Sequence, residues 1–346
     1  MNRFLVILCF IVILTVPVRA YDLTAPSVPE HAEKFMPDDQ TNFADGLLQV
    51  LRDALLYIRP DLKEAAGVCI RVTAIAMIVS LLRSFPGASE KTVNFSGCIG
   101  ITLNLLNSTG SLINLASSTV VDISHYGKLL LPVITAAMAS QGSISTSAAL
   151  YAGTAFFDAL LTSVVEKFLT PLVYFFLLLA VACGCIGEDI LKKMKDTLKS
   201  VIVWCLKTIL YIYTGYIGIT GIVSGTTDAA TLKATKLAIS GMVPVIGGIL
   251  SDASEAIIIS AGTVKNTAGV YGLFAILALW IGPFFKLGIH YLLLKATAGI
   301  CSIFSTKPSS DLIQDFTAAH GLLLAMIGTN CLMLLISIVC FMRGVG

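Results

Sequence analysis

Charged residues are scarce in this chain of 346 residues: Asp, Glu, Lys and Arg make up 13% of it, whereas hydrophobic residues make up 56%. The formal net charge is only +2, which excludes the strongly basic surface typical of nucleic-acid binding. The mean hydropathy of +0.88 is far above that of a water-soluble domain. The sequence therefore predicts a protein embedded in a lipid bilayer.

Motifs for catalysis and metal binding are also lacking. The sequence has neither an H-E-x-x-H zinc motif nor a G-x-x-x-x-G-K-[ST] phosphate loop. Cys183 and Cys185 are separated by one residue instead of the two of a redox or zinc motif. An intramembrane aspartyl protease needs two aspartates within apolar spans, and only Asp158 qualifies. We expect no enzymatic activity, no metal and no cofactor.

The first 42 residues have the pattern of a targeting segment and a leader. A short positive start at residues 1–3 precedes an apolar run over residues 4–16, and small residues follow. This pattern predicts a signal peptide over residues 1–20 and a flexible extracytoplasmic leader over residues 21–42. An uncleaved first membrane helix is the alternative, although the apolar run extends over only ~20 Å of the ~30 Å hydrocarbon core.

The rest of the chain has the pattern of successive helices. Apolar residues recur every three or four positions over residues 43–60, which predicts an amphipathic helix in the membrane interface or packed on the bundle. Residues 61–346 are expected to form the multi-span domain, in which Asp61 and Glu64 start the first span as a capping box and Lys286 lies at a turn. We predict an all-α polytopic bundle with about seven spans: residues 65–82, 146–165, 169–186, 201–223, 270–285, 287–304 and 320–342.

Four lysines between residues 192 and 199 form the most basic loop and indicate the cytoplasmic side. Residues 98–121 are too polar for an isolated lipid-facing helix. With an extracytoplasmic N-terminus, the lysines are cytoplasmic only if residues 98–145 cross the membrane zero or two times. We therefore predict a polar hairpin or re-entrant pair in that region, and a cytoplasmic C-terminus.

Residues 224–269 are expected to form an external loop of unusual composition. Its apolar stretches are broken by glycine and proline and are too short to span a bilayer. Interrupted half-helices of this kind occur at membrane depth where protein or a water cavity satisfies their backbone groups. A broken, re-entrant helical segment and a helical hairpin on the membrane surface both fit this pattern.

Ionisable residues inside apolar spans are costly to insert, by at least ~2.5 kcal/mol each, and are functional candidates by default. The candidates are Arg71, Asp158, Lys207, His290 and Lys295. An Arg71–Asp158 ion pair would neutralise two of them, and a polar interior or a subunit contact is the alternative. Lys207 has the reach to place its ammonium group at the cytoplasmic surface, and a pore-lining role is the alternative. A proton relay through His290 and Lys295 is a further hypothesis.

Small residues recur with small-xxx-small spacing from residue 201 onward. They are Thr214 and Gly218, followed by Gly221 and Gly225. This spacing allows helices to approach closely. The contact predicted here lies either within one chain or between copies in a homo-oligomer.

Three runs between residues 236 and 273 are distinctive: KLAISGMVPVIGG at 236–248, SDA at 251–253 and VKNTAGVYGL at 264–273. They resemble stage III sporulation protein AE of endospore-forming bacteria, and the similarity extends from about Phe43 to the C-terminus. The residues that carry this signature are Ser240, Pro244, Gly247, Gly248, Asp252, Lys265, Asn266 and Gly269.

The resemblance implies a polytopic subunit of a membrane complex that is made in the mother cell. It implies other membrane subunits and a forespore partner as binding partners, in a channel, secretion-like apparatus or feeding conduit across the two membranes around the forespore. The family has no catalytic motif. A stand-alone secondary transporter is the alternative function. That alternative predicts an inverted repeat, and the segments before and after Lys199 do not match in span spacing.

Overall fold

The computed structural model describes residues 26–37, 43–87, 89–140, 144–223 and 267–343, and within these ranges the chain is helical without any strand. The predicted all-α fold is therefore confirmed. The elements are α2 (Glu30–Glu33), α3 (Phe43–Tyr57), α4 (Arg59–Arg83), α5 (Glu90–Ser140), α6 (Ile144–Val164), the π-helical turn η1 (Val165–Leu169), α7 (Thr170–Ile186), α8 (Asp189–Val223), α11 (Thr267–Phe304) and α12 (Lys307–Arg343).

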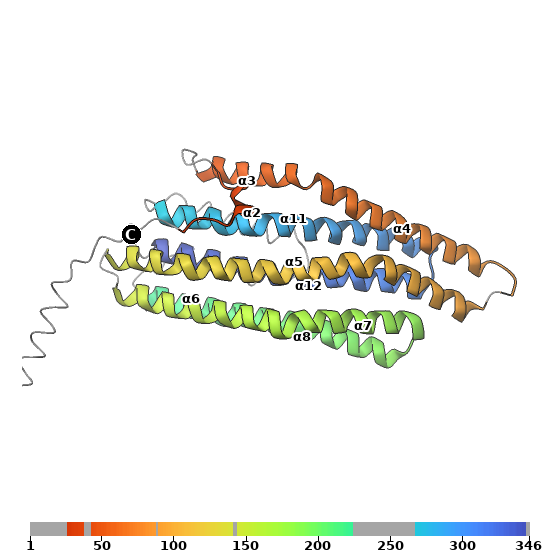
Figure 1. Cartoon of the computed structure of the whole chain (residues 1–346). Coiled ribbons are helices and arrows are strands. Elements are labelled where there is room, and N and C mark those ends of the chain that lie inside the picture. Colours follow the sequence, from red (N-terminus) through yellow and green to blue (C-terminus); the bar gives the residue numbers. More distant parts are fainter. Residues whose placement is uncertain (1–25, 38–42, 88, 141–143, 224–266, 344–346) are drawn as a thin grey trace, which may run out of the picture.

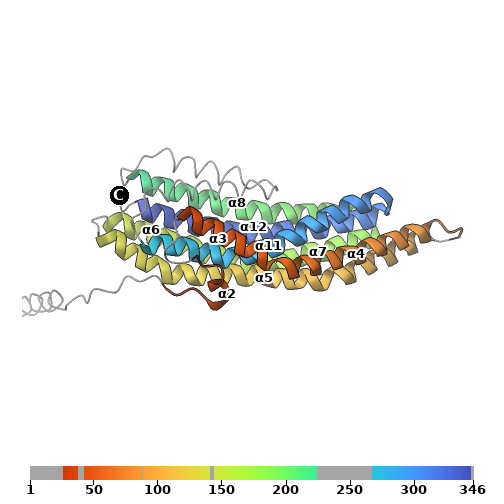
Figure 2. The same cartoon turned by 90° about the horizontal axis from the view of Figure 1, so that it is seen from above.

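The long helices lie side by side along one axis and alternate in direction (Figures 1 and 2). The central helix is α12, which packs against α5, α6, α7, α8 and α11. In the most apolar windows of α11 and α12, 72% and 78% of the residues are buried, against 33% in α4 and in the α6–α7 rod. The fold is thus a central α11–α12 hairpin surrounded by outer helices.

Glycines allow the closest approaches to this hairpin. A Cβ atom on Gly269 would lie 2.7 Å from the Met342 side chain, and one on Gly272 would lie 2.6 Å from Leu130. Real Cβ atoms do not approach other heavy atoms this closely. The lack of a side chain at these two positions therefore lets α11 pack directly against α12 and α5.

Five of the described helical segments are long and apolar enough to cross a membrane: Arg59–Arg83, Ile144–Ile186, Asp189–Thr220, Gly269–Phe304 and Lys307–Met342. The predicted count of seven is not confirmed. Two predicted pairs of spans are each one continuous rod. The η1 turn carries the chain past residue 166 without a break, and α11 continues through Lys286, whose ammonium group pairs with Asp61 of α4 at 2.9 Å.

The predicted hairpin over residues 98–145 is wrong, because α5 is one helix from Glu90 to Ser140. Several of its hydroxyl and amide groups donate to carbonyls one turn earlier, including Thr102 to Cys98 and Thr119 to Leu115. These bonds satisfy the polar groups without a turn in the backbone. A polar composition therefore did not imply a break in the helix.

The single α5 rod replaces the hairpin on which the expected topology was based. The extracytoplasmic N-terminus and the cytoplasmic C-terminus stay predictions, because residues 1–25 and 344–346 lie outside the described residues.

The amphipathic helix predicted over residues 43–60 corresponds to α3, and it packs on α11. Its buried stripe is made of Gly46, Val50 and Ala54, whereas Leu48 and Leu55 are exposed. Of the two alternatives offered by the sequence, packing on the bundle is the one observed. The exposed leucines leave an apolar edge on its other side.

The predicted capping box at Asp61 and Glu64 is not formed. The helix α4 begins earlier, at Arg59, with Ile58 as its N-cap and without a capping side-chain bond. Pro60 occupies the first turn, where its missing N–H has no partner to lose. The Asp61 carboxylate instead pairs with Lys286 and joins α4 to α11.

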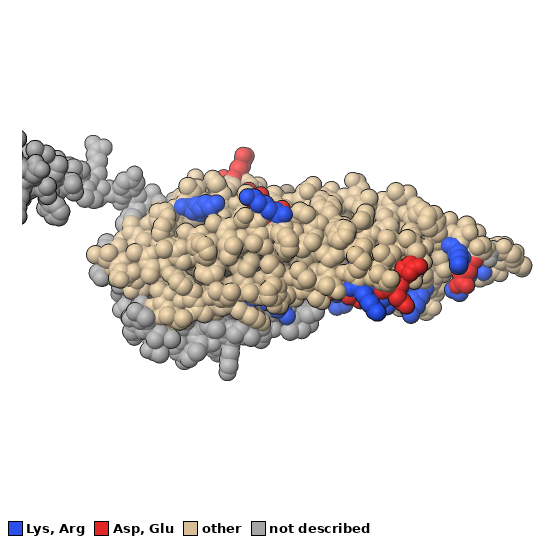
Figure 3. Space-filling view, turned by 90° about the horizontal axis from the view of Figure 1, so that it is seen from below, with Lys and Arg blue, Asp and Glu red and all other residues tan. Residues whose placement is uncertain are grey.

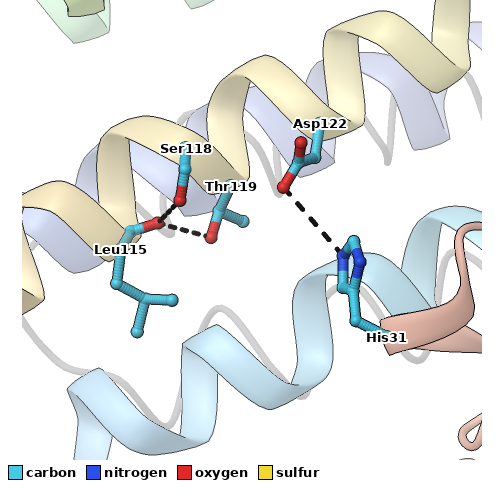
Figure 4. Close-up of polar contacts among 5 residues, drawn as sticks. All are labelled: His31, Leu115, Ser118, Thr119 and Asp122. Atoms are coloured by element: carbon cyan, nitrogen blue, oxygen red, sulfur yellow. Dashed lines mark hydrogen bonds and ion pairs between the residues drawn. The ribbon is translucent and has the colours of Figure 1, made fainter.

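Residues 26–37, expected to belong to a flexible leader, are packed against the bundle. Ala32 and Phe35 are buried, and the Tyr126 hydroxyl donates to the Pro26 carbonyl at 3.1 Å. Figure 4 shows His31 pointing toward Asp122 of α5, with 4.0 Å between Nε2 and Oδ2. Residues 1–25 lie outside the described residues, so the signal peptide stays a prediction.

Candidate functional site: a buried polar centre

A stripe of polar residues runs along one face of α6, although this helix is otherwise apolar. Thr154, Asp158 and Thr162 follow one another at intervals of four, so they lie on the same face. All three are buried, and Asp158 is only 1% exposed. Since α6 packs against α5, α8 and α12, the stripe lies between helices.

The Asp158 carboxylate is the only charged side chain on this stripe. Its Oδ2 atom accepts a hydrogen bond from the Ser124 hydroxyl of α5 at 2.5 Å. Asn330 of α12, which is 0% exposed, lies beside the same carboxylate. Lys128, one turn beyond Ser124, is close enough for an electrostatic interaction, but its side chain is exposed.

Tyr213 of α8 extends the polar contacts toward the end of the bundle where α12 ends. Its hydroxyl group is hydrogen-bonded to the Ser337 hydroxyl of α12 and lies 3.5 Å from that of Thr154. The Phe157 ring packs edge-on against Tyr213, with 5.4 Å between the ring centroids. We call this whole group the polar centre; it comprises Ser124, Thr154, Asp158, Thr162, Tyr213, Asn330 and Ser337.

Several polar atoms of this centre have no hydrogen-bond partner within the described parts of the chain. They are Asp158 Oδ1, Thr162 Oγ1 and both polar atoms of the Asn330 amide. Buried polar groups in native proteins are nearly always satisfied by protein, water or an ion. The polar centre therefore has the chemistry to hold a small polar or cationic group. It has one carboxylate, and the described parts of the chain contain no cluster of three metal-ligating residues.

The structure does not bring Arg71 and Asp158 together. Arg71 is exposed, and its Nε donates to Asn104 Oδ1 at 3.2 Å. The Arg71–Asp158 ion pair considered from the sequence is thus absent from the described structure, and the alternative of a polar interior describes Asp158 better.

Lys207, a separate candidate, is half-buried on α8.

His290 and Lys295 lie in different environments, because His290 is buried and Lys295 is exposed. The Lys295 ammonium group lies 5.5 Å from the Tyr291 ring centroid. The neighbour of His290 is His320 of α12. Their rings are parallel within 6°, with centroids 6.1 Å apart, and His320 Nδ1 donates to the Phe316 carbonyl at 2.7 Å. A relay from His290 to Lys295 does not follow from this geometry.

The small-residue positions on α8 differ in their surroundings. Thr214 is buried and donates to the Leu210 carbonyl at 2.7 Å, but no described atom lies within 4 Å of a Cβ built on Gly218. The side-chain surroundings of Gly221 and the position of Gly225 lie outside the described residues. Close approach to α8 occurs instead at Gly153 of α6, which lies against the Tyr216 ring.

The signature residues fall mostly in the part of the chain that is not described. Ser240, Pro244, Gly247, Gly248, Asp252, Lys265 and Asn266 all belong to it. Gly269 is described, in the first turn of α11, and permits the close contact with Met342. Its role in this structure is helix packing.

Of the polar centre, sequence reasoning identified Asp158 and missed the other members, which are Ser124, Thr154, Thr162, Tyr213, Asn330 and Ser337. A signal was present for Asn330, because an amide inside a long apolar run needs a partner within the protein. For the hydroxyl residues the sequence carried no such signal. Their grouping depends on which helices become neighbours.

A bundle of long apolar helices around a buried polar centre defines a polytopic α-helical membrane protein. Comparison with known protein families then identifies the family to which the chain belongs. The family pattern described as "Stage III sporulation protein AE (spore_III_AE)" matches residues 32–344, and the chain belongs to this family. The resemblance seen in the sequence is thereby confirmed.

One curated relative supports the same assignment. The protein named Stage III sporulation protein AE from Bacillus subtilis (strain 168) is 23% identical to this chain over 236 residues. That match covers 68% of this chain and 59% of the relative, so the chain matches less than two thirds of the relative's length. No solved structure matches.

Proposed function

We propose that the chain is a non-enzymatic, multi-pass subunit of the sporulation complex in the mother-cell membrane, where it helps to build a channel or feeding conduit toward the forespore. Family membership supports a role in sporulation. The observation that carries the structural part is the apolar exterior of the bundle. Large apolar side chains are exposed along the outer helices, among them Ile70, Leu178, Trp204 and Ile212.

The lengths of the helices support a role in assembly. A helix of 36 residues, such as Gly269–Phe304, extends over about 54 Å, whereas the hydrocarbon core is about 30 Å thick. Part of each long helix therefore lies beyond the hydrocarbon core. On the face shown in Figure 3, charged residues are sparse and several of them gather toward the narrow end of the bundle. Such an end is suited to contacts with other subunits outside the lipid.

Co-purification tests the proposal. Tagged protein is solubilised in mild detergent from sporulating cells, and an unrelated tagged polytopic membrane protein serves as the control. We expect other sporulation membrane proteins to be enriched with this chain and not with the control. Recovery of the chain alone, in repeated purifications, would contradict a role as a subunit.

Orientation in the membrane has its own test. Ile144 is exposed at the start of the α6–α7 rod. Lys193 is exposed near the start of α8, which follows the other end of that rod. In a background without other accessible cysteines, we expect an impermeant maleimide to label Lys193→Cys only from the cytoplasm and Ile144→Cys only from the other side. Labelling of both from one side would restore two separate spans over residues 146–186.

A stand-alone secondary transporter is the second candidate, and the buried Asp158 is the observation that favours it. Purified protein in proteoliposomes would then show saturable uptake of a solute without any other subunit. We expect no such uptake under our proposal. The comparison needs the same vesicles with an Asp158→Asn variant as a matched control.

A further inference from the structure

The charge of Asp158 has no buried partner within the described residues. Its carboxylate is 1% exposed, its Oδ2 atom accepts a hydrogen bond from Ser124, and the neutral Asn330 amide lies beside it. Burial of an ionised group without a partner is strongly unfavourable. Lys128 interacts with Asp158 from a distance, but its own side chain is exposed and it forms no ion pair with the carboxylate among those the structure shows. Within the parts of the chain that the structure describes, no positive charge is therefore paired with this carboxylate.

The unsatisfied atoms nearby are oxygens that can face a cation. Asp158 Oδ1, Thr162 Oγ1 and Asn330 Oδ1 are all buried and lack hydrogen-bond partners in the described structure. Asp158 and Thr162 are one turn apart on α6, and Asn330 lies beside Asp158 on α12. Two helices thus carry one anionic and two neutral oxygens without hydrogen-bond partners along the same buried stripe.

We propose that the polar centre binds a single monovalent cation on the Asp158 carboxylate. The cation is either a proton bound to Oδ1, or Na⁺ held by Oδ1 with the oxygens of Asn330 and Thr162 as its neutral ligands. One carboxylate balances one positive charge, which disfavours a divalent ion. Ser124 holds Oδ2, so that Oδ1 is the atom left for the cation. The site lies at the contact of α5, α6 and α12, where cation binding joins an outer helix to the central hairpin.

The other groups around Asp158 allow such a site. From α5 the charged group is Lys128, from α8 the titratable group is Tyr213, and α12 contributes the neutral Asn330 and Ser337. Tyr213 and Thr154 continue the polar stripe one turn beyond Asp158. A structural hydrogen bond between Ser124 and Asp158 alone would explain their contact, but not the unsatisfied atoms of Asn330 and Thr162.

Carbodiimide labelling tests this proposal on the wild-type protein. The full chain is purified in detergent and treated with dicyclohexylcarbodiimide, an apolar reagent that modifies protonated carboxyl groups. Mass spectrometry of peptides then locates the adduct. We expect Asp158 to be modified, at a rate that falls by about tenfold for each pH unit above its midpoint, as for a single proton.

A buried carboxylate within the same chain serves as the internal control. Asp315 is largely buried but is paired with Lys195 at 2.6 Å, so it already has its positive charge and is expected to resist modification. Absence of modification at Asp158 across the pH range would overturn the proposal, provided that the reagent modifies a reference carboxyl protein in the same buffer. A rate at Asp158 that does not change with pH would overturn it as well.

Salt dependence distinguishes the two cations. At constant pH and ionic strength, sodium chloride is exchanged for choline chloride. Slower modification of Asp158 in sodium identifies Na⁺ as a ligand, and in that case Asn330→Ala is expected to abolish the protection. An equal rate in both salts identifies the proton. Both results support a monovalent cation site, and neither depends on a variant that fails to fold.

Discussion

The central helix α12 and the outer helix α4 are similarly apolar in sequence but differ in their surroundings. The most apolar windows of α4 and α12 have mean hydropathies of 2.2 and 2.4, yet 33% of the first and 78% of the second are buried. In α12 the neighbours are other helices of the same chain, whereas α4 exposes Ile70, Met77 and Leu81. Hydropathy therefore identifies a membrane-type helix but not its place in the bundle.

Polar residues follow this difference only in part. His290, His320 and Asn330 belong to the hairpin and are buried, but Asp158 of the outer helix α6 is buried as well. Arg71, on the outer helix α4, is exposed and bonded to Asn104. We infer that the hairpin is specified by protein packing and that the outer helices are specified mainly by contact with lipid and other subunits. The following substitutions test this comparison.

Loss of a large core side chain is expected to have the largest effect. Phe316 of α12 is fully buried, so Phe316→Ala should destabilise the protein by about 3–5 kcal/mol through the cavity it leaves. Phe156→Ala on α6, where the ring is 62% exposed, is the matched control and should change stability little. Thermal unfolding in detergent measures both. Equal losses would remove the distinction between hairpin and periphery.

Overpacking of α11 is expected to have the next largest effect. In Gly272→Val the new side chain meets Leu130, and we expect a loss of about 1–3 kcal/mol. Gly288→Val is the control on the same helix, because no described atom lies within 4 Å of its Cβ position. The melting temperature should fall for the first variant well below that of the second. The reverse order would contradict the close α5–α11 contact.

Removal of one hydroxyl group from the polar centre is expected to have a smaller effect. Tyr213→Phe leaves the ring in place and deletes the bonds to Ser337 and Thr154, which should cost about 1 kcal/mol. Tyr211→Phe, two residues earlier and partly exposed, is the control. Urea or thermal titrations of both variants compare them directly. A larger loss of stability in Tyr211→Phe than in Tyr213→Phe would contradict the assignment of the buried face of α8.

The smallest effect is expected at the tip between α4 and α5. Arg83 Nη2 lies 2.5 Å from Glu90 Oε1, but both side chains are about half exposed. Exposed ion pairs contribute at most about 1 kcal/mol, so Glu90→Gln should leave the melting temperature nearly unchanged. A clear loss of stability would indicate that the tip is shielded from solvent.

The helical fold and the amphipathic helix α3 could be predicted because both depend on local apolar spacing. The continuity of α5 could not, because its polar groups bond to their own helix, as Thr119 does to Leu115. In α11, which continues through Lys286, the ammonium group of that residue pairs with Asp61, which is more than 200 residues away in the sequence. Local patterns contain no information on such a partner.

Only one residue of the candidate site, the one whose insertion into an apolar span is most unfavourable, could be predicted from the sequence. Asp158 was identified because a charge inside an apolar run is unfavourable wherever the helix lies. It accepts a hydrogen bond from Ser124 and lies beside Asn330, not Arg71. These belong to α5 and α12, and only the packing of those helices against α6 brings the three residues together.

Photolabelling from the lipid phase tests the central claim of a shielded hairpin most directly. The protein is reconstituted in bilayers that contain a membrane-soluble carbene precursor, and labelled peptides are identified by mass spectrometry. We expect adducts at outer positions such as Ile70 and Leu178, and almost none at Ile327 and Leu334, which are fully buried. Equal labelling of α12 and the outer helices would contradict the arrangement described here.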